Sequence, residues 1–245
     1  MNFELTSWSM MEMARGIASR EISAVDLMTA HLAWIERVNP RLNAIVELDA
    51  DRAMDAAREC DRRRPRDHES LYGVPMTVKG AWDCKGLTNT GGTLGRRSAS
   101  PANADATVIA RMRRAGAIPI GLTNLPEFSL AFESDNLLYG RTNNPYDRKR
   151  TAGGSGGGGA AAIAAGCAPI EIGGDMGGSI RLPAHFCGIA GLKPTLGRVP
   201  LSGYMPGPYG IAMMFATAGP MARRVEDLIA SLPIVAGPDG IDTGV

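Results

Sequence analysis

The sequence has 245 residues, of which 44% are hydrophobic and 21% charged, and this balance is typical of an ordinary globular protein with one large domain. A formal net charge of +1 gives no overall reason to expect a nucleic acid or an acidic partner. The four cysteines lack metal-like spacing, so we expect free thiols and no metal site. No apolar run is long enough to cross a bilayer, and the N-terminus does not resemble a signal peptide. We therefore expect a cytoplasmic protein without membrane association.

The first sixty or so residues are predicted to be helical. Ser9 with Glu12, and Ser23 with Asp26, have the spacing of the capping boxes that start helices. Apolar residues recur at helical intervals after Ser23. We expect Asn39-Pro40 to end that helix, because proline disfavours helical geometry in the residue before it.

The rest of the chain alternates between helix-like and strand-like segments. In order, we expect a helix at 50–62, a strand at 74–79, a helix at 105–115, a strand at 117–121, a helix at 160–165 and a strand at 168–172. This alternation predicts an α/β fold with a mixed central β-sheet flanked by helices. We treat residues 1–245 as one domain, with a helical layer over about 1–65 and a catalytic core over about 66–245.

Two serines lie in separate glycine-rich stretches. Ser155 lies within GGSGGGG at 153–159, and Ser179 directly follows GGDMGG at 173–178. Glycine allows backbone N–H groups to approach a ligand or a developing charge closely. A serine that follows several free N–H groups can attack a carbonyl while the same groups hold the resulting oxyanion, so the second stretch indicates a hydrolytic site.

Other interpretations of the glycines fit less well. The run 153–157 matches a nucleophile elbow, but residues 144–150 before it resemble a loop rather than the required strand. Only three histidines could complete a Ser-His-Asp triad, namely His31, His68 and His185. The run 154–159 fits a dinucleotide fingerprint, but it also lacks the preceding strand, and no Gly-Lys-Ser/Thr follows as a P-loop requires. A purely structural role would explain some glycines, but not the cluster before Ser179.

Several ordered segments resemble motifs of the amidase signature family of serine hydrolases, from the N-terminal helices to about Asp239. They are GVPMTVK at 73–79, GLTNLPEF at 121–128, GRTNNP at 140–145, the stretch from GGS at 153–155 to GGSIR at 177–181, GLKPT at 191–195, GRV at 197–199 and GPMAR at 219–223. The resemblance implies the amidase signature fold and an enzyme that hydrolyses a small-molecule carboxylic amide to an acid and an amine or ammonia. It implies no cofactor.

The resemblance also implies a Ser-Ser-Lys triad. Ser179 would be the nucleophile, Ser155 the bridging serine after a cis Gly154–Ser155 peptide bond, and Lys79 the general base. Burial favours the neutral form of lysine, which can accept a proton. Neutral Lys79 would take a proton from Ser155 and Ser155 one from Ser179, so that Ser179 forms an acyl-enzyme that water hydrolyses.

Backbone groups would complete this site. The N–H groups of Met176, Gly177, Gly178 and Ser179 would stabilise the oxyanion. The side chains of Asp175 and Arg181 are expected to form an ion pair that supports the loop.

Two departures from the family pattern lie inside the motifs. The family usually has a second serine directly after the bridging serine, where this chain has Gly156. It also tends to have threonine on both sides of the aspartate, where this chain has Gly174 and Met176. These changes are expected to loosen the oxyanion hole or reshape the acyl pocket.

The third departure is length. The sequence stops at Val245, whereas family members are longer and use their C-terminal half to complete the sheet and much of the pocket. We also expect Pro233 to interrupt the last helix, and an incomplete fold to leave an unpaired sheet edge. The alternative function is therefore a catalytically silent fragment or a partner-dependent subunit, such as a glutamine-hydrolysing amidotransferase subunit. The expected partner is a second copy of the chain or a complementing C-terminal chain.

Overall fold

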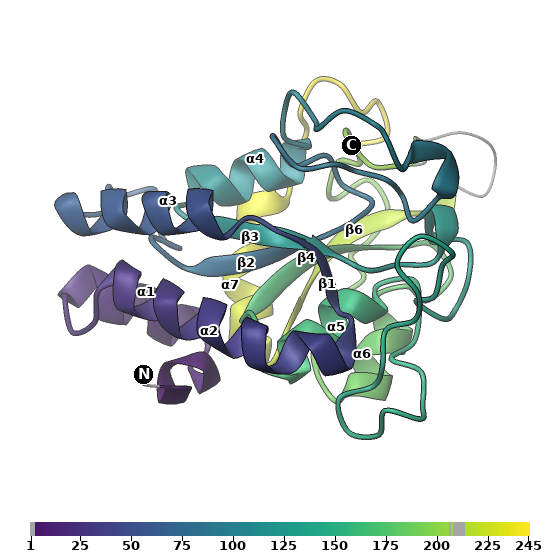
Figure 1. The fold of residues 1–245 in the computed structure, drawn as a ribbon. Helices are drawn as coiled ribbons and strands as arrows, with labels where there is room; N and C mark the ends of the chain where they lie inside the picture. Colours follow the sequence, from purple (N-terminus) through teal and green to yellow (C-terminus); the bar gives the residue numbers. More distant parts are fainter. Residues whose placement is uncertain (1–2, 206, 208–213) are drawn as a thin grey trace.

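A mixed β-sheet forms the centre of the protein in the computed structural model, which describes residues 3–205, 207 and 214–245. Within these residues the sheet has six strands in the order β1-β3-β2-β4-β6-β5 (Figure 1). Strand β2 is parallel to β3 and β4, whereas β1 and β6 are antiparallel to their neighbours, which confirms the mixed sheet predicted from the sequence. The strands are β1 Ile45–Leu48, β2 Pro75–Lys79, β3 Ile118–Thr123, β4 Ile170–Asp175, β5 Ala190–Gly191 and β6 Thr217–Ala222.

Helices cover both faces of the sheet. In Figure 1, α4 lies above the sheet, and α2, α5 and α6 lie below it. Helix α5 packs against β2, β4 and β6, so it covers the centre of one face. The α-helices are α1 Met10–Ser19, α2 Ala24–Leu42, α3 Ala50–Arg62, α4 Thr107–Arg114, α5 Gly157–Ala164, α6 Arg181–Cys187 and α7 Val225–Val235, and the 3-10 helices are η1 Phe3–Ser7, η2 Leu94–Arg96 and η3 Glu127–Ser129. None of the helices in the described part of the chain has the length and apolarity needed to cross a bilayer.

The starts of α1 and α2 follow the sequence prediction in different degrees. At α1, Ser9 and Glu12 form the predicted reciprocal capping box. At α2, the Ser23 side chain accepts a hydrogen bond from the N–H of Asp26, but the helix start has no reciprocal bond from the Ser23 N–H to the Asp26 side chain among the described residues. The carboxylate of Asp61 in α3 accepts hydrogen bonds from the first two N–H groups of α2 instead. A side chain distant in sequence thus caps α2.

Both predictions that a proline ends a helix are wrong. Helix α2 continues through Pro40 to Leu42, and α7 continues through Pro233 to Val235. Each proline lies near the C-terminal end of its helix, so few backbone hydrogen bonds are affected. In α2, the Asn39 side chain also accepts hydrogen bonds from the two N–H groups that follow the helix cap.

The two glycine-rich stretches are more regular than expected. Helix α5 begins at Gly157, three residues earlier than the predicted helix, and β4 continues to Asp175, three residues beyond the predicted strand. A Cβ on Gly158 would collide with the backbone of Asn124 after β3, so only glycine allows α5 to approach the sheet this closely. The segment predicted as a loop before Ser179 is therefore partly a strand.

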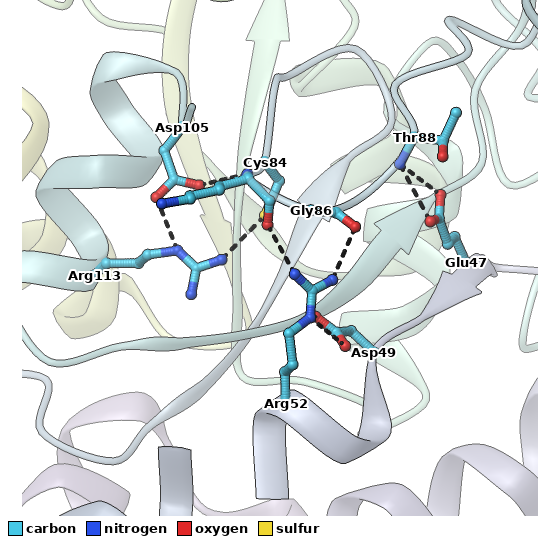
Figure 2. A network of polar contacts seen from close by, with 9 residues as sticks. Glu47, Asp49, Arg52, Cys84, Gly86, Thr88, Asp105 and Arg113 are labelled. Carbon is cyan, nitrogen blue, oxygen red and sulfur yellow. Dashed lines mark hydrogen bonds and ion pairs between the residues drawn. The ribbon is translucent and has the colours of Figure 1, made fainter. Parts of the chain in front are cut away.

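A network of charged side chains anchors the long loop between β2 and α4 (Figure 2). Arg52 of α3 donates hydrogen bonds to the carbonyls of Lys85 and Gly86. The Glu47 carboxylate of β1 accepts from the N–H of Thr88 at 3.0 and 3.2 Å. Asp105, at the far end of the loop, accepts from the N–H of Lys85 at 2.7 Å. The chain that leaves β2 after the candidate base is thus held at both ends.

Candidate active site

Lys79 ends β2, the strand between the two parallel partners of the sheet. Its side chain is fully buried, with Nζ 2.7 Å from Ser155 Oγ. Nζ also lies 3.1 Å from the Tyr204 hydroxyl and 3.4 Å from the Gly174 carbonyl oxygen. The fold thus brings together a lysine and a serine that are 76 residues apart in sequence.

Ser155 precedes α5 and is also fully buried. The Gly154–Ser155 peptide bond is cis, as the sequence resemblance implied. The Ser155 carbonyl accepts a hydrogen bond from Ser134 Oγ, which in turn accepts from the N–H of Gly157. Ser134, which the motifs did not single out, therefore ties the Ser155 turn to the loop before it.

Ser179 lines a small cavity and is 7% exposed. The cavity has a volume of about 30 Å³ and is also lined by Ser129, Gly174 and Tyr204. Ser179 Oγ makes no hydrogen bond to a residue of the described chain, so the expected contact between the two serine hydroxyls is not formed in this structure. The two loops meet through the backbone, where the N–H of Gly156 donates to the Ser179 carbonyl at 3.0 Å.

Gly156 allows this backbone contact. A Cβ at this position would lie 2.7 Å from the Ser179 carbonyl oxygen. Real Cβ atoms do not approach an oxygen so closely, so a serine here would require the loops to move apart. The departure from the family's double serine thus has a steric reason in this chain.

Asp175 holds the turn that presents Ser179. Its carboxylate accepts from the backbone N–H groups of Gly178, Ile180 and Arg181, and from two nitrogens of the Arg181 side chain, both at 3.0 Å. Burial raises the pKa of Asp175, but these hydrogen bonds outweigh burial and hold the pKa below its usual value. The carboxylate is therefore charged and fixes the turn from inside.

The oxyanion donors predicted from the sequence differ in availability. The N–H of Gly178 donates to the Asp175 carboxylate at 2.8 Å, so it is not free to serve as an oxyanion donor in this structure. The N–H groups of Met176, Gly177 and Ser179 make no hydrogen bond within residues 3–205, 207 and 214–245. These three groups can still receive a developing negative charge.

The four cysteine side chains and His31 offer no competing reactive centre among the described residues. Burial raises the pKa of the Cys167 and Cys187 thiols to about 12, and that of Cys60 and Cys84 to about 11, so none is a thiolate near neutral pH. The buried His31 ring bonds the Cys167 carbonyl, and burial lowers its pKa to about 4. The described residues contain no group of three or more histidine, cysteine or acidic side chains placed to hold a metal ion.

The sequence comparisons show the family to which the chain belongs. A family model described as Amidase matches residues 26–244. The chain belongs to the amidase signature family. This amidase signature chain is 42% identical over 237 residues to human fatty-acid amide hydrolase 2, across 93% of this chain and 44% of that protein. It is also 42% identical over 240 residues to indoleacetamide hydrolase of Bradyrhizobium diazoefficiens, across 96% of this chain and 45% of that protein.

Solved structures extend the similarity to the amidase signature fold. Peptide amidase from Stenotrophomonas maltophilia matches with a TM-score of 0.90 and 34% identity, across 99% of this chain and 50% of that one. A protein from a vestigial complex related to an s-triazine catabolic enzyme matches with a TM-score of 0.90 and 39% identity, across 97% of this chain and 51% of that one. The chain thus spans about half the length of the relatives that it matches.

Two residues of this amidase signature site were not predicted from the sequence. Tyr204 contacts Lys79 through its hydroxyl, and no motif of the sequence pointed to it. Glu171 is fully buried in β4 on the sheet face covered by α5, with Oε2 accepting from Thr123 Oγ1 at 2.9 Å. The sequence could have indicated Glu171, because it lies between two isoleucines of a predicted strand and buried acidic residues are rare.

Proposed function

We propose that the chain carries the catalytic triad of an amidase that hydrolyses a carboxylic amide to an acid and an amine or ammonia. The main support is the buried 2.7 Å contact between Lys79 Nζ and Ser155 Oγ beside a cavity that Ser179 lines. Lys79 and Ser155 are both fully buried, and a general base must lie within hydrogen-bond distance of the proton that it accepts. The names of several relatives, such as indoleacetamide hydrolase, are those of enzymes that act on amides.

In the proposed reaction, Ser179 is the nucleophile. Its Oγ turns toward Ser155 and attacks the amide carbonyl while its proton passes to Ser155, whose own proton passes to Lys79. The free N–H groups of Met176, Gly177 and Ser179 stabilise the oxyanion. The proton then returns through Ser155 to the leaving nitrogen, the C–N bond breaks, and water hydrolyses the acyl-enzyme.

Labelling with a fluorophosphonate probe tests this proposal. The purified chain should react at Ser179, as read by mass spectrometry of its peptides. Ser179→Ala should abolish labelling, and Lys79→Met should slow it by about a hundredfold or more, because general-base catalysis is typically worth that much. Ser19→Ala, in α1, should label like the wild type. Labelling that persists in Ser179→Ala would exclude Ser179 as the nucleophile.

The second candidate, a subunit that is silent without a partner, is favoured by apolar side chains around the site. Leu130, which lines the cavity, is 69% exposed. Phe132, two residues later, is 63% exposed, and Phe215, next in sequence to the cavity-lining Ala216, is 59% exposed. Large exposed apolar side chains beside a cavity are typical of a surface that another chain covers. A folded wild-type chain that the probe does not label would favour this second candidate.

A further inference from the structure

The Tyr204 hydroxyl lies between Lys79 and the mouth of the cavity. It is 3.1 Å from Lys79 Nζ and donates a hydrogen bond to Ser129 Oγ at 3.2 Å. Because its one proton goes to Ser129, the hydroxyl is left to accept a hydrogen from Lys79. The direction of both hydrogen bonds is therefore set.

The Tyr204 ring is held firmly in this position. It packs edge-on against the buried Trp82, with ring centroids 4.6 Å apart, and the backbones of the two residues form an antiparallel bridge. The N–H of Met205 also donates to the Ala81 carbonyl at 2.7 Å. The segment that carries Tyr204 is thus attached to the chain that follows Lys79.

Gly174 provides the space for the tyrosine. A Cβ on Gly174 would lie 2.8 to 2.9 Å from three atoms of the Tyr204 side chain, including the hydroxyl oxygen. A side chain at residue 174 would therefore displace the Tyr204 ring and hydroxyl from their present positions. The glycine at this position leaves room for the tyrosine beside Lys79.

The contacts of Lys79 also hold its nitrogen in place. Nζ lies within hydrogen-bond distance of three oxygens: the Gly174 carbonyl, the Tyr204 hydroxyl and Ser155 Oγ. The carbonyl, and the Tyr204 hydroxyl that already donates to Ser129, each accept a hydrogen from the amine. These two contacts keep Nζ beside Ser155, the residue with which a base at this position would exchange a proton.

We propose that Tyr204 is a positioning residue that holds Nζ of Lys79 against Ser155, from the space that a side chain at position 174 would fill. The inference rests on the proposed function, because it assigns Lys79 the role of base. It concerns this chain's own combination of Gly174 and Tyr204. The tyrosine transfers no proton to the substrate and acts only through the lysine.

The first test compares two tyrosine variants in the full chain. Tyr204→Phe removes only the hydroxyl and should slow fluorophosphonate labelling of Ser179 by about tenfold, the effect of losing one orienting hydrogen bond. The matched control is Tyr139→Phe, which removes a hydroxyl that contacts Thr90 at 3.2 Å, and it should label like the wild type. Equal labelling of Tyr204→Phe and wild type would overturn the inference.

A double-mutant cycle separates positioning from a general structural effect. Gly174→Ala should slow labelling because its methyl group displaces the Tyr204 hydroxyl. In the Tyr204→Phe background, Gly174→Ala should slow the labelling of Ser179 little further, since the Tyr204 hydroxyl is already absent. Fully additive effects would show that residues 174 and 204 act independently and would contradict the inference.

A measurement that needs no activity distinguishes this inference from the proposed function. The chain has only four lysines, Lys79, Lys85, Lys149 and Lys193, so a ¹³Cε-lysine spectrum is simple to assign. The order parameter of the Lys79 methylene should fall in Tyr204→Phe and stay unchanged in Tyr139→Phe. An unchanged value in Tyr204→Phe would refute the positioning role even if Ser179 is labelled. A wild type that is not labelled would refute the proposed function alone.

Discussion

Glu171 is a single ionisable residue with a large effect expected on stability. Its carboxyl reaches over β2 to Thr123 on β3 and lies against α5, where a Cβ on Gly159 would collide with it. Oε1 has no hydrogen-bond partner within the described residues. Burial raises the pKa of Glu171 to about 7, although hydrogen bonds from the neighbouring hydroxyls lower it in part.

The raised pKa predicts how stability depends on pH. Between about pH 4.5 and 7 the folded chain holds the Glu171 proton and the unfolded chain releases it, so the free energy of unfolding from this group falls as pH rises. The loss is on the order of 3 kcal/mol once pH exceeds about 7. Glu171→Gln should remove this slope, so its stability relative to wild type should rise from pH 5 to pH 8.

Urea unfolding at pH 5, 6, 7 and 8 would measure the difference. Glu36→Gln, which changes an exposed glutamate of α2, is the control and should follow the wild type at every pH. A difference between wild type and Glu171→Gln that stays constant over this range would mean that Glu171 has an ordinary pKa in the folded chain.

At the scale of elements, regular local patterns were predictable and packing-dependent elements were not. The bounds of α3 were predicted as observed, and β2 was found within one residue, because both follow from periodicity and composition. Helix α5 begins in three glycines, which disfavour a helix, and only packing against the sheet stabilises that turn. The two-residue β5 and the irregular β1 have too little sequence pattern to be recognised.

The loop between β2 and α4 provides a test of how one helix stabilises another segment. Arg52 and Arg58 both lie on α3 and both pair with an aspartate three residues earlier. Only Arg52 also donates to the loop, through the Lys85 and Gly86 carbonyls (Figure 2). Arg52→Ala should therefore speed hydrogen exchange of residues 83–106, and Arg58→Ala should not.

Hydrogen exchange followed by mass spectrometry would resolve these peptides. Faster exchange confined to α3 in Arg52→Ala would mean that the loop is held by its other contacts, such as Glu47 and Asp105.

At the scale of the whole molecule, Arg223 joins segments from both ends of the chain. Its guanidinium donates to the carbonyls of Ile163 and Ala168, next to α5, and to those of Thr6 and Trp8 at the N-terminus. Burial lowers the pKa of Arg223 because it disfavours the charged form of the side chain. The hydrogen bonds to the four carbonyls are therefore needed to stabilise the buried charge. The sequence resemblance pointed to the GPMAR segment, but periodicity could not reveal what its arginine contacts.

The corresponding prediction concerns stability alone. Arg223→Met keeps the aliphatic stem but removes four hydrogen bonds to backbone carbonyls, so unfolding should become easier by about 3 kcal/mol. Arg224→Met changes the neighbouring, exposed arginine and should cost less than about 0.5 kcal/mol. Thermal and chemical unfolding of the two variants would decide between a connecting role and a surface role for Arg223.

Contacts between residues far apart in sequence limited how much of the candidate site could be predicted. Lys79, Ser155 and Ser179 were expected together because each lies in a recognisable motif. Tyr204 is 125 residues from Lys79 and belongs to no motif, so only the folded chain reveals the contact. Long-range contacts of this kind depend on the paths of loops, which residue patterns do not specify.

Asp227 of α7 has a consequence for the order in which the chain folds. Its carboxylate accepts hydrogen bonds from the N–H groups of Met10 and Met11, 217 and 216 residues earlier, and so completes the start of α1. During synthesis at up to about 20 residues per second, the N-terminal helix must wait about ten seconds or more for this acceptor. Helix α1 is therefore synthesised well before α7 but reaches its final environment only after α7.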